Sequence, residues 1–314
     1  MKTLLSCILL LALSRAGAAP VEMNSTLDGL GYLPDAARKA PTLPMGSTRA
    51  KVSKAGSFSQ RDEKQAGFTV GMDAFAWAGT LQADGNEMRW RLFAPTVTGN
   101  VRCPLVVFLH GLGEAGADNT AQFKHDEFLV FAQPAIQRAC PAYVLAPQHA
   151  RGESWGGPVV EQPRFQLRML VALIDQLRVK FPVDLSRIYI VGLSSGAGGV
   201  IDAVTLYPDV FAAGVAISNT HGSPYMIAER RRKPSPVWFF INDGESQPIL
   251  DNAKTLPDAM ARWGSDIRLT VADKRAGHAA WQWSFFHPDL LPWLFRQQLS
   301  VRPSYFEAAD RARK

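Results

Sequence analysis

Short apolar runs and longer helix-type repeats alternate along most of the chain. The runs are rich in β-branched and aromatic residues, which is typical of buried strands. They cover 105–109, 142–146, 188–191, 212–218, 237–242 and 267–271. Apolar residues recur at helical spacing over 166–181, and helices are also predicted for 252–263 and 288–298. This alternation predicts a single α/β domain with a mostly parallel, twisted sheet and helices on both of its faces.

The segments on either side of this pattern differ from it. Residues 68–81 and 88–93 predict two strands joined by a turn at Asp84-Gly85-Asn86. Residues 19–66 have little periodicity, which predicts an extended or partly disordered N-terminal segment. We expect the catalytic domain at 67–300 and a basic C-terminal tail at 301–314.

The first eighteen residues have the features of a signal peptide. Lys2 precedes the apolar run from Leu4 to Leu13, which is too short to span a bilayer, and small residues at 16–18 offer a cleavage site. Cys7 stands too early in the run for a lipid-anchor motif. We therefore expect a secreted or periplasmic protein with no integral membrane segment after cleavage.

Composition and charge narrow the class of partner. Of the 314 residues, 47% are hydrophobic and 20% charged, which fits a globular protein with a large core. The net charge of +6 comes from scattered basic residues, apart from a run at 230–233 and the tail. No nucleic-acid motif is present, so we expect no nucleic-acid partner.

The stretch from Arg187 to Gly199 carries the main candidate for chemistry. A predicted strand runs directly into Gly192-Leu193-Ser194-Ser195-Gly196, and a helical pattern follows. Strand, Gly-x-Ser-x-Gly and helix form the nucleophile elbow, a tight turn that exposes the central serine hydroxyl above the sheet. Ser194 is therefore the predicted nucleophile. Ser195, one residue off the glycine frame, is the alternative.

A serine nucleophile needs a base and an orienting carboxylate, which follow it in the order acid and then His in elbow-bearing proteins. His278 lies just after the last predicted strand and fits the base. The other histidines precede the serine, precede any plausible acid, or abut a proline. Asp243 and Glu245 both follow the strand at 237–242. Glu245 better fits the spacing from the strand end, and Asp243 remains the alternative acid.

The negative oxygen of an acyl-transfer intermediate needs two preorganised N–H donors. We expect one from the backbone of Ser195 and the other from Leu112, in the loop after the strand at 105–109. Gly111 and Gly113 allow that loop to approach closely.

Three tryptophans lie on loops expected near this site. Trp155, Trp281 and Trp283 could form aromatic walls for a substrate, although such residues also serve as packing. The chain is too short for a large lid, so we expect an open site.

The combined segments resemble the α/β-hydrolase superfamily. They are PLVVFLHGLGEAGADN, AYVLAPQ, DLSRIYIVGLSSGAGG, PVWFFINDGE and AGHAAW, from about Pro104 to Trp281. The resemblance is to secreted esterases related to polyhydroxybutyrate depolymerases, feruloyl esterases and prolyl-oligopeptidase-like hydrolases. Two features depart from the family pattern. Ser195-Gly196-Ala197 stands where Met-Gly-Gly is frequent, and Ile241-Asn242 with Glu245 stands where His-Gly and Asp are usual.

The resemblance implies an esterase that cleaves small-molecule or polymer-linked carboxylic esters through an acyl-enzyme, with no cofactor and no metal. A peptidase of the same fold and a non-catalytic binding protein are the alternatives. The sequence does not define the natural ester or the oligomeric state.

The resemblance also bears on Cys103 and Cys140. Each precedes a proline and then a strand, at 105–109 and at 142–146, and these strands should be parallel neighbours in this fold. In-register neighbours lie about 4.8 Å apart, within the Cα range of a disulfide. We therefore expect a disulfide between Cys103 and Cys140, with a one-residue register slip as the arrangement that would prevent it.

Overall fold

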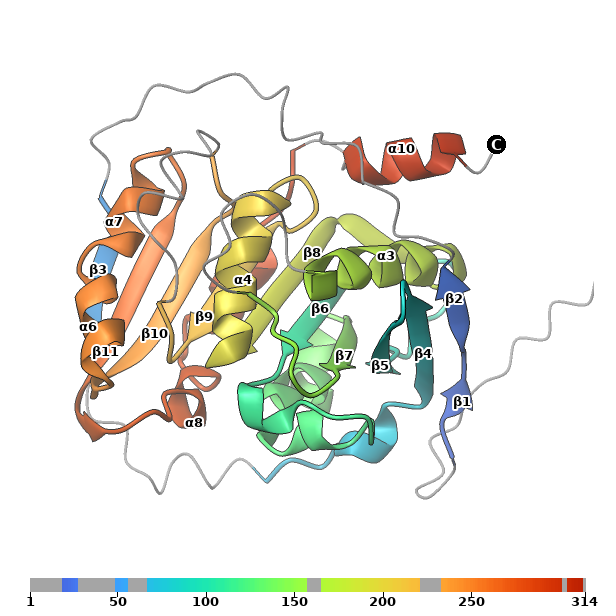
Figure 1. Ribbon diagram of the computed structural model, residues 1–314, viewed down its shortest axis with the longest axis horizontal. Coiled ribbons are helices and arrows are strands. Elements are labelled where there is room, and N and C mark those ends of the chain that lie inside the picture. Colours follow the sequence, from blue (N-terminus) through green and yellow to red (C-terminus); the bar gives the residue numbers. More distant parts are fainter. Residues whose placement is uncertain are drawn as a thin grey trace, which may run out of the picture.

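A computed structural model of the chain describes residues 19–27, 49–55, 67–156, 165–220, 233–300 and 304–312. Eleven strands of these residues form one sheet, mostly parallel, in the order β1-β4-β5-β7-β6-β8-β9-β10-β11-β3, with β2 also paired to β4 (Figure 1). The strands of the sheet interior are β4 (Trp77–Ala83), β5 (Asn86–Phe93), β6 (Cys103–Leu109), β7 (Tyr143–His149), β8 (Val183–Leu193), β9 (Ala213–Ile217), β10 (Val237–Gly244) and β11 (Ile267–Ala276). The predicted signal peptide lies outside the described residues.

One hairpin gives the sheet its antiparallel part. β5 is antiparallel to both β4 and β7, and the other pairings are parallel. The predicted turn joins β4 and β5, and Asp84 and Gly85 take left-handed φ angles of 47° and 75°. Positive φ at both central residues suits a tight hairpin, which explains why Asp-Gly occurs there.

Helices cover both faces of the sheet. One face carries α3 (Phe165–Lys180), α4 (Ser195–Leu206), α6 (Gln247–Ala253) and α7 (Leu256–Ala261), which lie in front of the strands in Figure 1. The other face carries η4 (Ala121–Phe123), η5 (Asp126–Ala132), α2 (Pro134–Ala139), α8 (Trp281–Ser284) and α9 (Leu290–Arg296). Short 3₁₀ turns stand at η2 (Met72–Ala74) and η3 (Leu112–Glu114).

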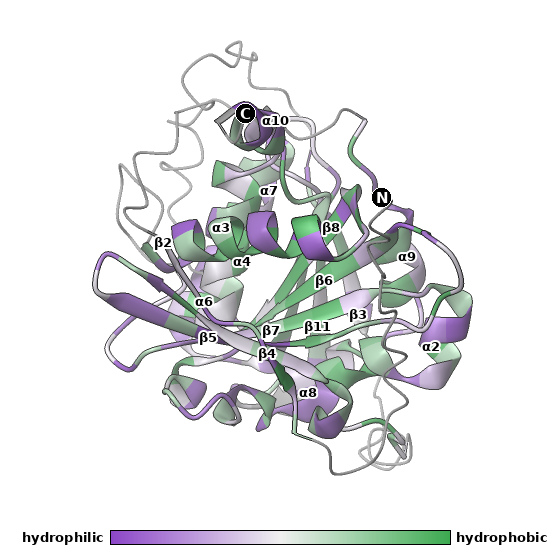
Figure 2. Ribbon diagram, turned by 90° about the vertical axis from the view of Figure 1, so that its right-hand side faces the viewer, coloured by the Kyte–Doolittle hydropathy of each residue, from purple (hydrophilic) through white to green (hydrophobic). Residues whose placement is uncertain are grey.

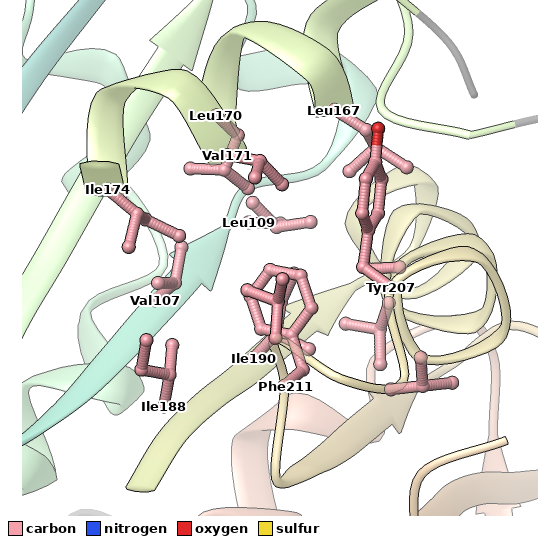
Figure 3. Packing of buried hydrophobic residues seen from close by; sticks show 14 of the residues in the cluster. Val107, Leu109, Leu167, Leu170, Val171, Ile174, Ile188, Ile190, Tyr207 and Phe211 are labelled. Carbon is pink, nitrogen blue, oxygen red and sulfur yellow. The ribbon is translucent and has the colours of Figure 1, made fainter. Parts of the chain in front are cut away.

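The sheet separates two hydrophobic cores, and successive residues of each strand alternate between them. Val107 and Ile190 pack in one core and Val106 and Tyr189 in the other. Figure 3 shows the first core, where residues of α3 face Val107, Leu109, Ile188 and Ile190. Central strands buried on both faces account for the continuous apolar runs in the sequence, and Figure 2 shows β6 and β8 as hydrophobic while α3 alternates between polar and apolar residues.

Parts of the N-terminal segment form the outermost strands. β1 (Val21–Glu22) and β2 (Ser25–Leu27) pair with β4 at one edge of the sheet, and β3 (Lys51–Ala55) pairs with β11 at the other. Ser53 and Thr270 also share a hydrogen bond of 2.8 Å between their hydroxyls. The segment predicted as extended thus contributes to both sheet edges.

The described C-terminal residues form a helix that packs against α3. In α10 (Ser304–Ala312), Phe306 is fully buried, and Arg178 of α3 pairs with Asp310 at 2.7 Å. The helix carries Glu307, Asp310 and one basic residue, Arg311, so most of the basic residues expected in the tail lie outside it.

Most predicted elements occur within a few residues of their expected bounds, and two do not. Residues 68–76, predicted as part of a strand, contain only the turn η2. The helix expected over 252–263 is divided into α6 and α7, because Pro257 starts a new helix at its second position. Among the described residues, no helix is long and apolar enough to span a bilayer.

Candidate active site

Ser194 occupies the turn between β8 and α4. Its backbone angles, φ 52° and ψ −117°, lie in a region that residues other than glycine rarely adopt, and its N–H donates to the Ile217 carbonyl at 2.8 Å. The glycines on either side are required by close packing. A Cβ on Gly192 would lie 2.6 Å from the Gly196 carbonyl carbon, and a Cβ on Gly196 would overlap the Leu109 carbonyl oxygen. The turn therefore has the strained, closely packed geometry of a nucleophile elbow.

His278 and Glu245 complete a chain of hydrogen bonds with Ser194. His278 Nε2 lies 2.7 Å from Ser194 Oγ, and His278 Nδ1 lies 2.7 Å from Glu245 Oε2. The Glu245 side chain is fully buried, whereas the imidazole is 44% exposed. Because a carboxylate only accepts hydrogen bonds, Nδ1 carries the proton and Nε2 is left to accept from the serine hydroxyl. The three residues come from the carboxyl ends of β8, β10 and β11.

The alternative acid, Asp243, occupies a different position. It is exposed in the last part of β10, while Glu245 stands just beyond the strand and faces His278. The structure thus brings Ser194, His278 and Glu245 together and leaves Asp243 out of the chain of hydrogen bonds.

The loop after β6 approaches the nucleophile closely. A Cβ on Gly111 would lie 3.5 Å from Ser194 Cβ, 3.0 Å from Leu193 Cδ1 and 2.8 Å from Glu114 Oε2. Leu112 follows directly and is 64% exposed. Ser195 is the first residue of α4, whose free N–H groups lie at the same end of the helix as Ser194. Leu112 and Ser195, the predicted N–H donors, therefore directly follow two residues that approach each other, Gly111 and Ser194.

Two buried histidines support this loop from beneath. His110 Nδ1 lies 2.6 Å from the Gly111 carbonyl, and His110 Nε2 is the acceptor for the His149 N–H at 3.4 Å. This pattern requires a neutral imidazole protonated on Nδ1. Burial, with the neighbouring His149, lowers the pKa of His110 from 6.5 to about 3, so the ring stays neutral near pH 7.

Glu114 places a carboxylate inside the same loop. It is 4% exposed, and its Oε1 lies 3.5 Å from His125 Nε2 and 3.6 Å from Lys124 Nζ. The hydrogen bond with His125 lowers the pKa of Glu114 despite its burial. His125 in turn packs on Trp281, with ring centroids 4.9 Å apart. Through Glu114 the loop is thus connected to Lys124, His125 and Trp281.

The tryptophans expected to line a substrate site are mostly internal. Trp155 is fully buried and packs against the rings of His110 and His149, and Trp283 is 1% exposed and packs against Phe240. The expectation of a substrate wall is therefore wrong for Trp155 and Trp283, since both are packing residues.

Trp281 is the one that reaches the site. Its ring lies 5.5 Å from that of His278 and nearly perpendicular to it, at 86°, although only 7% of Trp281 is exposed. A substrate in the site could therefore contact only an edge of the Trp281 ring.

Three polar residues beside the site were missed by the sequence reasoning. Asn219 Nδ2 donates to the Ser194 carbonyl at 2.9 Å, Ser218 Oγ accepts from the Ala280 N–H at 2.8 Å, and Asn242 Nδ2 donates to the Gly277 carbonyl at 3.0 Å. All three stand at the ends of strands β9 and β10. Their position, polar residues directly after buried runs, was the signal that could have found them.

The predicted disulfide is not formed, and both cysteines are free thiols. β6 and β7 pair with Leu105 opposite Tyr143, so the position matching Cys103 is Pro141 rather than Cys140. Cys140 instead ends helix α2. The register is slipped by one residue from the one that the disulfide required, which corrects that prediction. Burial raises the pKa of both thiols.

In the described part of the chain, no three His, Cys, Asp or Glu side chains are grouped so as to hold a metal ion. The site consists of a serine, an imidazole and a carboxylate, with backbone N–H donors around them. This set of groups can transfer an acyl group by nucleophilic attack and proton transfer.

Comparison with known proteins agrees with this reading. No protein-family model matches the sequence. The chain is similar to poly(3-hydroxyalkanoate) depolymerase C of Paucimonas lemoignei, with 29% sequence identity over 132 residues. The matched region covers 40% of this chain and 29% of the length of the depolymerase. A thermostable esterase superposes with a TM-score of 0.63 and 32% identity, covering 71% of this chain and 63% of that one. A feruloyl esterase module from Clostridium thermocellum superposes with a TM-score of 0.55 and 14% sequence identity, covering 70% of this chain and 87% of the module.

These similarities confirm the expected class. The chain has the α/β-hydrolase fold, and it is similar in sequence and structure to esterases with that fold. It spans less than two thirds of the depolymerase and of the thermostable esterase that it matches.

Proposed function

We propose that the protein is a serine hydrolase that cleaves carboxylic esters through an acyl-enzyme intermediate. The observation that carries this proposal is the continuous chain of two 2.7 Å hydrogen bonds from Ser194 through His278 to Glu245. The similarity to esterases and to a polyester depolymerase supports it.

The geometry suggests the order of proton transfers. His278 Nε2 accepts the proton of Ser194 Oγ as that oxygen attacks the ester carbonyl carbon. Glu245 stabilises the imidazolium that forms and holds its Nδ1–H in place. The carbonyl oxygen becomes negative and accepts hydrogen bonds from the N–H groups of Leu112 and Ser195.

In the later steps of the reaction His278 first donates the proton that it accepted and then accepts one from water. His278 gives its proton to the leaving alcohol oxygen as the bond from that oxygen to carbon breaks, which leaves the acyl group on Ser194. A water molecule then gives a proton to His278 and attacks the acyl carbon, and the acid is released as Ser194 regains its proton. The half-exposed imidazole leaves access for a small-molecule or polymer-linked ester.

We further propose that the protein is secreted or periplasmic. The signal-peptide features of residues 1–18 support this proposal. The similarity to the poly(3-hydroxyalkanoate) depolymerase is compatible with it.

The proposal is tested by ester hydrolysis with the nucleophile removed. Purified protein should hydrolyse p-nitrophenyl, feruloyl, acetyl-sugar or hydroxyalkanoate esters faster than a matched peptide amide. Ser194→Ala should lower kcat by about 10⁴ to 10⁶. Ser195→Ala is the matched control, since it keeps the backbone N–H and should retain most of the activity.

Other outcomes discriminate the alternatives. Faster cleavage of the peptide amide would favour a peptidase of the same fold. Activity that survives Ser194→Ala but not Ser195→Ala would move the nucleophile by one residue. No turnover of any ester or amide would favour a non-catalytic binding protein.

A further inference from the structure

We propose that Ser218 and Asn242 are positioning residues that hold the loop of residues 277–280, which carries His278. The inference rests on the proposed function, in which His278 is the base. Neither residue belongs to the Ser194–His278–Glu245 chain, and both act through the backbone on either side of the imidazole.

Ser218 holds the far end of the loop. It follows β9, is fully buried, and its Oγ accepts the Ala280 N–H at 2.8 Å. Its own N–H donates to the Phe240 carbonyl at 2.8 Å, so the serine is anchored to the neighbouring strand β10.

The backbone of Ser218 indicates that its hydroxyl has a role. Its φ of 55° lies in the left-handed region, where glycine is accommodated more easily than any residue with a Cβ. Such a conformation in a side-chain-bearing residue is uncommon and clusters at functional sites. Here the strained residue is the one that provides the acceptor for Ala280.

Asn242 holds the near end of the loop. It is 2% exposed, its Nδ2 donates to the Gly277 carbonyl at 3.0 Å, and its Oδ1 accepts the Trp283 Nε1–H at 2.9 Å. The two partners fix which end of the amide faces which way, because one is an acceptor and the other a donor. Asn242 thereby ties the loop both to β10 and to helix α8.

The loop depends on such anchors because Gly277 and His278 are exposed, and only Ala280 at its far end is fully buried. Gly277 takes a left-handed φ of 85°, and the His278 side chain is 44% exposed. Burial of the imidazole therefore cannot set its place. The hydrogen bonds at Gly277 and Ala280 bracket His278, together with the Gly277 N–H bond to the Gly244 carbonyl at 3.2 Å. A displacement of about 1 Å in a base can reduce turnover about 10²-fold.

The test compares variants that remove each anchor without creating a packing defect. Ser218→Gly removes the hydroxyl and relieves the left-handed strain, so it should fold. Asn242→Asp keeps the acceptor for Trp283 but sets an oxygen against the Gly277 carbonyl. Ser284→Ala is the matched control, since Ser284 Oγ is buried and has no hydrogen-bond partner in the part of the chain that the structure describes.

Three readouts are measured: kcat and KM on the best ester, labelling of Ser194 by a fluorophosphonate, and hydrogen exchange of the Ala280 amide. In Ser218→Gly we expect faster exchange at Ala280, a kcat lowered about 10- to 100-fold, KM within about twofold and an unchanged or higher Tm. Asn242→Asp should lower kcat and slow Ser194 labelling by a similar factor. Ser284→Ala should leave kcat and the labelling rate within about twofold.

The outcomes separate this inference from the proposed function. If the wild-type protein hydrolyses esters through Ser194 but Ser218→Gly and Asn242→Asp keep full kcat, the positioning role is overturned and the esterase stands. If no ester is hydrolysed, the proposed function fails, and unchanged Ala280 exchange and Ser194 labelling in the variants would overturn the positioning role as well. If both variants have a lowered Tm and lose activity only as far as the unfolded fraction at the assay temperature explains, the role is reduced to stability alone.

Discussion

The two sides of the site are held in place by different kinds of groups. On the base side, residues 242–245 and 277–280, the supports of His278 are an amide, a hydroxyl and backbone groups, and the one buried carboxylate is Glu245 itself. On the oxyanion side, residues 110–114, the supports are ionisable: His110 beneath the loop and Glu114 within it.

This difference has a chemical reason. On the base side the loop that carries His278 is held by neutral hydrogen-bonding groups, so the position of the imidazole depends on how well these groups fit together. On the oxyanion side, a buried carboxylate near a developing negative charge would oppose it, and Glu114 lies beside the Lys124 ammonium and is hydrogen-bonded to His125. We therefore expect the base side to be sensitive to shape and the oxyanion side to be sensitive to charge and pH.

The largest effect on the base side should come from Glu245. Glu245→Gln keeps the size of the side chain but offers no negative charge to the imidazolium, and we expect kcat to fall about 10⁴-fold, as when a triad carboxylate becomes an amide. Asp243→Asn is the matched control and should change kcat less than about threefold. Steady-state kinetics of both variants decide the matter, and the reverse ranking would assign the acid to Asp243.

On the oxyanion side, the substitution expected to lower activity most is Gly111→Ala. The added Cβ would meet Glu114 Oε2 at 2.8 Å and Leu193 Cδ1 at 3.0 Å, so either the buried Glu114 carboxylate or the loop itself has to move. We expect kcat to fall about 10- to 10³-fold, the range for loss of one oxyanion donor, with fluorophosphonate labelling slowed in parallel. Gly113→Ala, where nothing lies within 4 Å of the new Cβ, is the control and should be close to wild type. Equal losses in the two variants would argue against a close approach at Gly111.

On the oxyanion side, His110 should make the free energy of unfolding depend on pH. Because the pKa of His110 is about 3 in the folded protein and about 6.5 when unfolded, the unfolded chain binds the proton first as the pH falls. The stability contributed by the neutral ring is therefore complete above about pH 6.5 and is lost as the pH falls toward 3. Between pH 7 and pH 5 the loss is about 2 kcal/mol.

Denaturant unfolding of wild type and His110→Gln at pH 7 and pH 5 measures this contribution. The variant should show a smaller loss of stability over that interval. A direct check is the proton NMR signal of the His110 ring, which should not titrate between pH 7 and 4.5. A ring that titrates near pH 6.5 would contradict the buried, neutral assignment.

The smallest effect should come from Lys124. Its side chain is 65% exposed and lies 3.6 Å from Glu114, and exposed ion pairs of this kind contribute about 0–1 kcal/mol. Lys124→Met should change kcat less than about threefold. His125→Leu should cost more, because His125 is the less exposed partner and also packs on Trp281. A larger effect for Lys124 than for His125 would make the ion pair, rather than the hydrogen bond and ring packing of His125, the main support of Glu114.

The sequence predicts the fold well because its strongest signals are local. The continuous apolar runs marked the central strands, and the glycine frame around Ser194 marked the elbow, since only that packing demands glycine at 192 and 196. The loop positions of Glu245 and His278 followed from the strand ends. Spacing from the strand end favoured Glu245 but left Asp243 as an alternative, because the direction of each side chain is fixed only in the folded structure.

The predictions that were wrong or incomplete concerned features that depend on tertiary structure. The disulfide depended on strand register, and one residue of slip between β6 and β7 was enough to separate Cys103 from Cys140. Trp155 lies on a loop and Trp283 in the short helix α8, and both side chains point inward, which composition does not reveal. Ser218 and Asn242 were missed because their partners are backbone groups of a distant loop, and no motif records such a contact.

The pairing of the N-terminal segment with both sheet edges has a consequence for the order of assembly. β1 finds its partner β4 a short way along the chain, so that edge can close early. β3 needs β11, and its Ser53 contacts Thr270 across 217 positions, so the opposite edge can close only after nearly the whole domain has formed. Until that final step β11 presents an open edge to other chains, which is the stage at which we expect a slowly folding molecule to aggregate.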